Sequence, residues 1–255
     1  AQQKTVNIVT VNNPGMITLK KLASKFEEAN PNIKLNWLVL EENIMRQRIT
    51  TDVSTGGGQF DVIFIGLYEA PIFAKRGWLK EMENIPAEYD IEDVFKGLRD
   101  GLSYDGKLYA LPFNGESSML MYRKDVFAKE GLKMPAHPTW AQVADLAAKL
   151  DGAEPGMKGI CLRGLPGWGE VFAPLTTVVN TFGGTWWSAN DDGTIAEAQV
   201  DQPEFREALE FYVGLLADAG EDDAANASFN ECLAQYRDGQ VAMWYDATVA
   251  AGLLE

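Results

Sequence analysis

The first 65 residues alternate between short apolar runs with the period of a strand and amphipathic runs with the period of a helix. The runs that read as strands are 4–11, 33–40 and 61–65, and those that read as helices are 16–31 and 44–53. Strand–helix–strand order is typical of a parallel sheet with right-handed crossovers. We therefore predict an α/β fold in which a mainly parallel sheet is flanked by helices.

Polar side chains and one aromatic follow the three predicted strands, where loops leave the sheet. They are Asn12, Asn13, Glu41, Glu42 and Tyr68. Open α/β sheets bind ligands at this edge, and amide, carboxylate and phenol groups suit a ligand with hydroxyl groups. Asparagine also caps helices, and glutamate also lies on solvated surfaces, so the residues leave both interpretations open.

The alternation is interrupted between residues 103 and 123. An Asp105-Gly106 pair signals a hairpin, and two extended runs follow it, interrupted by Pro112 and Gly115. Such a segment suits a crossing between two lobes, with Glu116 at the crossing.

Helices and strands then alternate again, including a capping box at Thr139-x-x-Gln142, a strand over 158–164, a hairpin with its bend at 190–193, and a strand over 241–246. We predict two domains, 1–112 and 113–255.

The stretch CLRGLPGWGE (161–170) places an arginine, a tryptophan and a glutamate on one glycine-rich loop. Sugars and polyols offer apolar C–H faces that pack on an indole, and hydroxyl groups that bind charged and amide side chains. Arg163, Trp168 and Glu170 provide that mixture. Core packing is an alternative role for Trp168, and the start of a helix would by itself explain Glu170.

Composition removes several other functions. The formal net charge is −15, which disfavours nucleic acid and anionic membrane surfaces, and one histidine and two cysteines are too few for a typical zinc site. No nucleotide-binding, hydrolase or metalloprotease motif occurs, so we expect no cofactor or metal. No apolar run approaches the ~20 residues that a membrane helix needs, so we expect no membrane span. A glycosidase needs only a carboxylate pair, which leaves an enzyme using two of Glu116, Glu170 and Asp246 as an alternative.

Several longer stretches resemble the extracellular solute-binding proteins of ABC importers. They are FDVIFIGLYEAPIFAKRGWL, LYALPFNGESSMLMYRKDVF, GICLRGLPGWGE and FNECLAQYRDGQVAMWYDATVAAG. The last two are similar to the sugar-alcohol (mannitol/sorbitol-type) branch of the maltose-binding-like group. The resemblance implies a two-lobed periplasmic-binding-protein fold of type II kind with a ligand cleft between the lobes. It also implies a monomeric periplasmic receptor, not an enzyme, that binds a hexitol, pentitol or small sugar reversibly and delivers it to a permease.

The resemblance also implies a set of ligand-binding residues. They are Asn13, Glu42, Tyr68, Glu116, Arg163, Trp168, Trp244 and Asp246. Chains of this group are longer than 255 residues and return to complete the first lobe, so we expect the first lobe to be incomplete here. Ala1 suits the site at which a signal peptide is removed.

Cys161 and Cys232 both fall in the expected second lobe. An oxidising periplasm permits a disulfide between them, and two free thiols remain the alternative. The sequence does not determine which polyol binds. It also leaves open the alternative that the chain is a ligand-binding domain of a sensor or adhesion module.

Overall fold

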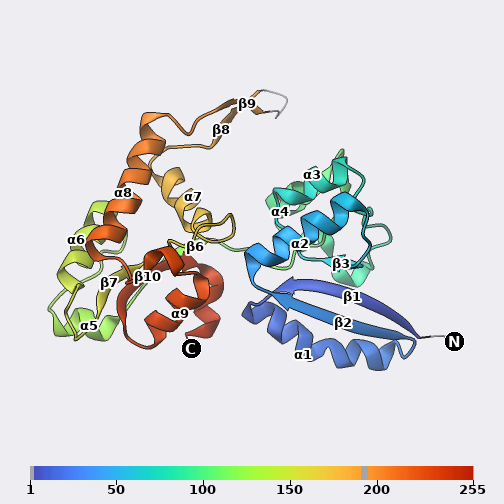
Figure 1. The fold of residues 1–255 in the computed structure, drawn as a ribbon, viewed down its shortest axis with the longest axis horizontal. Helices are drawn as coiled ribbons and strands as arrows, with labels where there is room; N and C mark the ends of the chain where they lie inside the picture. The colour runs from blue at the N-terminus through green and yellow to red at the C-terminus, as the bar shows by residue number, and fades with distance from the viewer. Residues whose placement is uncertain (1–2, 191–194, 255) are drawn as a thin grey trace. The chain divides into compact units, whose positions relative to one another are not determined.

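The computed structural model describes residues 3–190 and 195–254 (Figure 1). The chain divides into two compact units, unit 1 (Ala1–Gly115) and unit 2 (Glu116–Glu255). This division falls a few residues after the sequence-predicted boundary, within the same extended segment. Within the described residues, no helix is long and apolar enough to cross a membrane.

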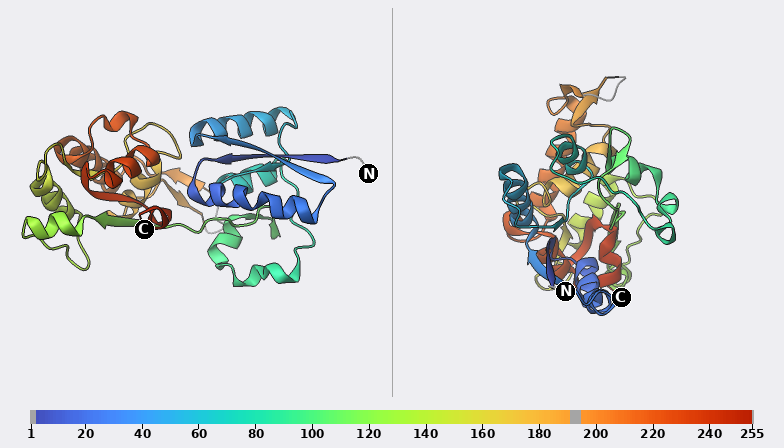
Figure 2. Two further views of the ribbon diagram at one scale, coloured as in Figure 1. Left: turned by 90° about the horizontal axis from the view of Figure 1, so that it is seen from below. Right: turned by 90° about the vertical axis from the view of Figure 1, so that its right-hand side faces the viewer.

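Unit 1 is built on a parallel sheet with strand order β2-β1-β3, as its alternating sequence predicts. The elements are β1 (Lys4–Val11), α1 (Pro14–Ala29), β2 (Ile33–Leu40), α2 (Glu42–Thr55) and β3 (Val62–Ile63). Val11 lies opposite Leu40, so β1 and β2 end at the same edge of the sheet. Helices α1 and α2 run on opposite sides of these two strands (Figures 1 and 2).

The remainder of unit 1 consists of short elements. They are α3 (Glu69–Lys75), two 3-10 turns (Ala87–Tyr89 and Ile91–Asp93), α4 (Lys96–Gly101), β4 (Ser103–Tyr104) and β5 (Lys107–Leu108). The predicted hairpin is confirmed, because β4 and β5 pair antiparallel. Its two central residues, Asp105 and Gly106, have φ angles of 50° and 73°. Both signs are those that a type I′ turn requires.

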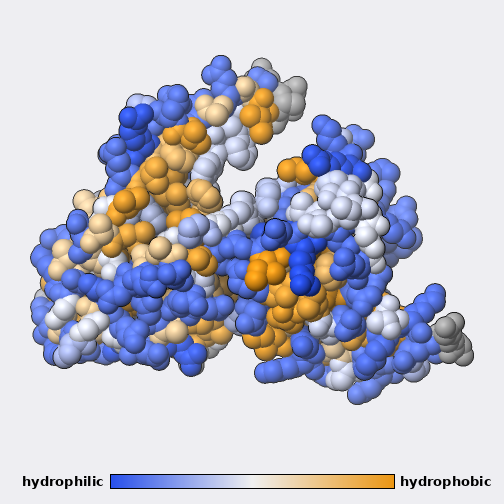
Figure 3. All heavy atoms as spheres, viewed as in Figure 1, coloured by the Kyte–Doolittle hydropathy of each residue, from blue (hydrophilic) through white to orange (hydrophobic). Residues whose placement is uncertain are grey.

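The core of unit 1 is small, and one side of α1 remains outside it. Val9, Met45 and Ile49 are buried together, but Met16 is the only buried residue of α1. The apolar side chains on that helix are exposed instead: Ile17 44%, Leu19 39%, Leu22 46% and Phe26 45%. Figure 3 shows apolar atoms at the surface of this unit. Helix α1 therefore forms as its periodicity predicts without burying its apolar stripe.

Unit 2 has a mixed sheet with strand order β6-β10-β7. Its strands are β6 (Ser118–Tyr122), β7 (Lys158–Cys161) and β10 (Val241–Ala247). The central strand β10 is parallel to β7 but antiparallel to β6, whereas the sequence suggested a mainly parallel sheet. Because β6 and β10 are far apart in the chain, no short crossover fixes their relative direction.

Five helices and a hairpin complete unit 2 in the described residues. They are α5 (Lys124–Lys129), α6 (Trp140–Leu150), α7 (Phe172–Thr181), β8 (Trp187–Ala189), β9 (Ile195–Ala198), α8 (Pro203–Ala219) and α9 (Phe229–Arg237). Short 3-10 turns cover Ala224–Asn226 and Thr248–Leu253. The predicted capping box at Thr139 is confirmed at the start of α6, and a second one begins α9. The bend predicted at 190–193 lies mostly outside the described residues.

A disulfide joins β7 to α9 in unit 2. Cys161 and Cys232 are bonded, with Cα atoms 5.7 Å apart, and neither residue is exposed. Their alternative as free thiols is therefore wrong for this structure. Both sulfurs pack in a buried cluster with Trp244, beside the loop that follows β7. The loop carrying Arg163 thus begins directly after a covalently anchored residue.

Candidate ligand-binding site

The loop after β7 starts in a constrained backbone conformation. Arg163 has a φ of 67°, in the left-handed region that side chains other than glycine seldom adopt. The Tyr212 hydroxyl on α8 donates a hydrogen bond to the Arg163 carbonyl at 2.8 Å and contacts the Leu162 carbonyl as well. At Gly164 a Cβ atom would lie 2.5 Å from the Ala224 carbonyl oxygen. These contacts fix the direction in which the Arg163 side chain leaves the strand.

The Arg163 guanidinium lies between two carboxylates. Its Nε donates to Asp246 Oδ2 at 2.7 Å, and its Nη2 donates to the other oxygen of the same carboxylate. Its Nη1 donates to the Gly169 carbonyl at 3.0 Å and to Glu170 Oε2 at 3.4 Å. Arg163, Glu170 and Asp246 are 5%, 4% and 1% exposed, so this is a buried ionic cluster. A bidentate arginine–carboxylate pair is among the strongest hydrogen-bonded arrangements in proteins.

Two aromatic residues contact this cluster. Trp244 donates from its indole Nε1 to Asp246 Oδ2 at 3.0 Å, and the Phe229 ring lies 5.1 Å from the Arg163 guanidinium carbon. Trp244 has no exposed surface. In this structure, Trp244 therefore acts as a positioning residue for Asp246 and presents no face to a ligand.

Trp168 is the exposed part of the same loop. Its side chain is 43% exposed, although the loop that carries it is anchored by Arg163 and Glu170. Glu170 also accepts a hydrogen bond from the main-chain N–H of Phe229 at 3.3 Å. The loop therefore combines a buried ionic cluster with an exposed indole, and an exposed indole is what stacking on a sugar or polyol needs.

Unit 1 contains a second arginine between two carboxylates. Arg46 on α2 contacts Glu42 Oε1 and Glu69 Oε2, each at 2.6 Å. Glu69 Oε2 also accepts from the Gly66 N–H at 2.7 Å, and the Tyr68 hydroxyl donates to Glu69 Oε1 at 3.1 Å. Burial, together with the nearby Glu69 charge, raises the pKa of Tyr68 to about 12. Tyr68 is therefore a neutral phenol that can donate or accept a hydrogen bond.

Sequence reasoning named Glu42 and Tyr68 but missed Arg46 and Glu69. The spacing of Glu42 and Arg46 is that of an i,i+4 ion pair and was a usable signal. Glu69 gave no comparable signal, because its partner Arg46 is 23 residues earlier in the chain.

The polar residues that follow β1 and β2 have structural roles as caps. Asn13 Oδ1 accepts from the Met16 N–H at 2.8 Å and caps α1, and Glu41 accepts from the Asn43 and Ile44 N–H groups and caps α2. The capping alternative is thus confirmed for Asn13, and its role in ligand binding stays a prediction. Glu116 is exposed at the start of unit 2, next to Ser117, whose N–H donates to Thr248.

A family of known proteins matches nearly the whole chain. The family model described as "Bacterial extracellular solute-binding protein" matches residues 12–254. The chain belongs to this family. The mannitol-binding protein of Pseudomonas aeruginosa is 45% identical to it over 98% of this chain and 56% of that protein. The erythritol/L-threitol-binding protein of Mycolicibacterium smegmatis is 24% identical over 98% of this chain and 55% of that protein.

Solved structures of this family have the same fold. A solute-binding protein from Agrobacterium vitis with bound D-mannitol has a TM-score of 0.89 and 47% identity, covering 98% of this chain and 59% of that one. A protein from Agrobacterium radiobacter in complex with ribitol has a TM-score of 0.86 at 23% identity and supports the fold alone. This chain therefore spans somewhat more than half the length of these solute-binding relatives.

Proposed function

We propose that this chain acts as a receptor that reversibly binds a sugar alcohol or small sugar and delivers it to the permease of an ABC importer. The observation that carries the proposal is its identity of 45% and 47%, across 98% of the chain, to a mannitol-binding protein and to a protein crystallised with D-mannitol. The exposed indole of Trp168, on the same loop as the buried arginine–carboxylate cluster, supports the same conclusion from the chemistry of the site.

The chemistry of a linear polyol fits the two groups of side chains. The C–H groups of the ligand pack on the Trp168 ring, while hydroxyl groups form charge-assisted hydrogen bonds with carboxylates and arginine. In unit 1, Glu42 and the neutral phenol of Tyr68 would supply such contacts, with Asn13 at the end of β1. In unit 2, Glu116 would contribute directly, and Arg163 and Asp246 chiefly by holding Trp168 in place.

Reversible binding fits this geometry better than hydrolysis. Both oxygens of Asp246 accept hydrogen bonds from Arg163, and Glu170 Oε2 contacts Arg163 and the Phe229 N–H. A carboxyl group that acts as a general acid or base needs room to take up and release a proton at the substrate. We therefore propose a binding protein rather than the carbohydrate-active enzyme that the sequence left open.

The remaining features follow from the family. Extracellular solute-binding proteins of ABC transporters work outside the cytoplasmic membrane, and we propose a periplasmic location for this one. We further propose that it acts as a monomer, with the permease subunits as its protein partners.

Thermal unfolding with a panel of small ligands tests the function. The protein at full length should be stabilised by D-mannitol or a related hexitol or pentitol, and not by charged ligands of similar size. A free ligand concentration of 100 times Kd stabilises the folded state by about 2.7 kcal/mol. No shift with any sugar alcohol or small sugar would contradict the proposal. Conversion of the ligand after long incubation, followed by NMR, would favour the enzyme.

A further inference from the structure

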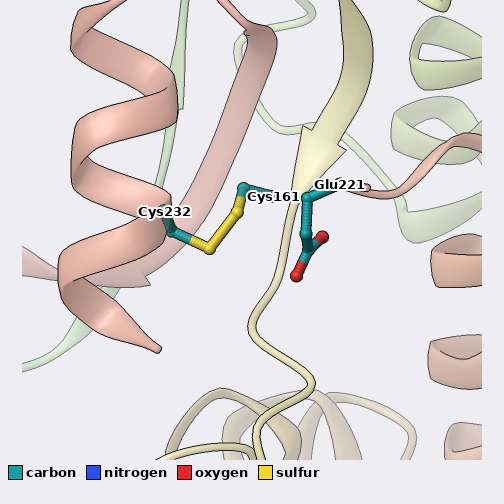
Figure 4. Close-up of side chains that lie close together, drawn as sticks. All are labelled: Cys161, Glu221 and Cys232. Atoms are coloured by element: carbon teal, nitrogen blue, oxygen red, sulfur yellow. A yellow bond between two sulfur atoms is a disulfide. The ribbon is translucent and has the colours of Figure 1, made fainter. Parts of the chain in front are cut away.

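Three side chains that could hold a metal ion meet in the interior of unit 2. Figure 4 shows Glu221 beside the disulfide of Cys161 and Cys232. One potential ligand atom from each residue lies within 4.8 Å of the other two, and all three residues are buried. The residues come from β7, the segment after α8, and α9. Gly220 forms a parallel bridge with Ile160, which places Glu221 next to Cys161.

The Glu221 carboxyl has one oxygen that the fold does not satisfy. Oε2 accepts a hydrogen bond from the Leu162 N–H at 3.1 Å, which orients the group. Oε1 is buried and has no hydrogen-bond partner. Leaving a buried polar atom without a partner destabilises the fold, so an unsatisfied group of this kind requires an explanation. Neither the fold nor the proposed polyol site provides one.

The three donor types, two sulfurs and one carboxylate oxygen, are those that a thiophilic cation binds once the disulfide is reduced. Zinc binds thiolate sulfur at about 2.3 Å and carboxylate oxygen at about 2.0–2.2 Å, which places two coordinating sulfurs about 3.8 Å apart. The Cα atoms of the two cysteines are 5.7 Å apart, and their side chains meet between β7 and α9. Small rotations of these side chains would open the space between the sulfurs without moving either element.

We propose that in the thiol form Cys161, Cys232 and Glu221 bind a thiophilic divalent cation of the Zn²⁺ class, and that the disulfide and the ion are alternative occupants of one site. In the oxidised chain the two sulfurs are bonded to each other and cannot bind an ion as thiolates. In the reduced chain, ion binding releases the two thiol protons. Because the site is fully buried, the ion enters as unit 2 folds, and its binding energy contributes to that folding.

Oxidation of the loaded site would exchange one occupant for the other. The azo compound diamide accepts two electrons from the two thiolates and two protons from water, and becomes the hydrazine. The Sγ–Sγ bond forms, and the ion is released because its two sulfur ligands are lost. Release of one Zn²⁺ per chain into a chromogenic chelator, as the disulfide forms, is the expected result.

Titration with Co²⁺ tests the site directly. The chain is reduced with a phosphine, which is not a thiol ligand, freed of reductant under anaerobic conditions, and titrated while the near-ultraviolet absorption of cobalt–thiolate bonds is recorded. We expect one Co²⁺ per chain, displaced by Zn²⁺. Cys232→Ser should abolish the absorption. Glu221→Gln should weaken Zn²⁺ binding at least ~10-fold, in the range seen when groups around a metal are altered. The matched control is Glu130→Gln, an exposed residue remote in sequence from the cluster, which should bind like the unaltered chain.

Circular dichroism gives the second measurement. If the reduced chain is unfolded without metal, Zn²⁺ should restore its helical signal. A reduced chain that shows no cobalt–thiolate absorption and gains no helical signal with Zn²⁺ overturns the proposal. Equal Zn²⁺ affinity in the Glu221→Gln and Glu130→Gln variants would remove Glu221 from the site and overturn it as stated.

Discussion

The two units use the same arrangement of charges at different depths. In each, an arginine lies between two carboxylates near an aromatic residue. In unit 1 the Arg46 side chain is 12% exposed and that of Glu42 is 26% exposed. In unit 2 the Arg163 side chain is 6% exposed and that of Asp246 is 1% exposed. The extent of burial distinguishes the two clusters. The more buried cluster of unit 2 fixes a loop, and the less buried cluster of unit 1 leaves the Glu42 carboxylate accessible to solvent.

The apolar cores of the two units also differ, and unit 2 has the larger one. Unit 2 buries an extended apolar core around Ile160, Tyr212 and Met243, with a disulfide beside it. Unit 1 has a smaller core, and the apolar side of α1 is exposed. The exposed indole of Trp168 is thus carried by the more heavily anchored unit. Four variants test this difference, and their expected effects decrease in order.

Removing the buried arginine should have the largest effect. Arg163→Ala leaves the buried Asp246 and Glu170 carboxylates without their cationic partner, and breaking a buried pair in this way costs about 3–5 kcal/mol. Urea unfolding, combined with hydrogen exchange resolved by peptide, should place the loss in unit 2. A loss below about 1 kcal/mol would show that the cluster does not anchor the loop.

Removing the disulfide should destabilise unit 2 alone. Cys161→Ala with Cys232→Ala should lower its free energy of unfolding by about 2–4 kcal/mol, because the cross-link no longer restricts the unfolded chain. Hydrogen exchange in β1 and α2 of unit 1 should be unchanged. Equal loss of protection in both units would contradict the view that they are separately stabilised.

The shallower arginine should matter less. Arg46→Ala leaves Glu69 buried with its Gly66 and Tyr68 contacts intact, so we expect a loss of about 1–2 kcal/mol in the free energy of unfolding of unit 1. The same urea and hydrogen-exchange measurements apply. A loss as large as that of Arg163→Ala would mean that depth does not distinguish the two clusters.

An exposed ion pair of unit 2 provides the smallest effect and a pH dependence. The Arg123 side chain lowers the pKa of Asp125 to about 2, from an unfolded value of about 3.9. A lowered pKa stabilises the fold above the unfolded value, and this contribution is lost as the pH falls through about 2. Because Asp125 is largely exposed, solvent screening reduces the contribution to a few tenths of a kcal/mol. Asp125→Asn should therefore cost that much at pH 7 and nothing near pH 2, by urea unfolding.

Local patterns made several elements of both units predictable. The Asp105-Gly106 turn, the Thr139 capping box and the strand–helix alternation each depend on a few neighbouring residues. The antiparallel pairing of β6 with β10 does not, because the two strands come from distant parts of the chain. The exposure of the apolar side of α1 could not be predicted either, since periodicity defines an apolar stripe but not what covers it.

The site was predictable only in part, for the same reason. Glycine and proline around Trp168 indicated a loop, and its exposure agrees with that reading. Trp244 has the same chemistry, yet it lies beneath Asp246 with no exposed surface, because its place in the central strand decides its depth. The partnership of Arg46 with Glu69 and the position of Glu221 depend on contacts between distant segments, which residue types alone do not reveal.

Calorimetry with D-mannitol tests most directly whether the loop carrying Trp168 binds the ligand. Trp168→Ala is compared with Trp187→Ala, which removes another exposed tryptophan of unit 2, 51% exposed, from a different segment. A Kd of about 1 μM corresponds to about −8 kcal/mol of binding free energy. Loss of the stacked indole should weaken binding at least ~10-fold, equivalent to about 1.4 kcal/mol. We predict that weakening for Trp168→Ala and unchanged affinity for Trp187→Ala, whereas equal affinities in the two variants would contradict the account.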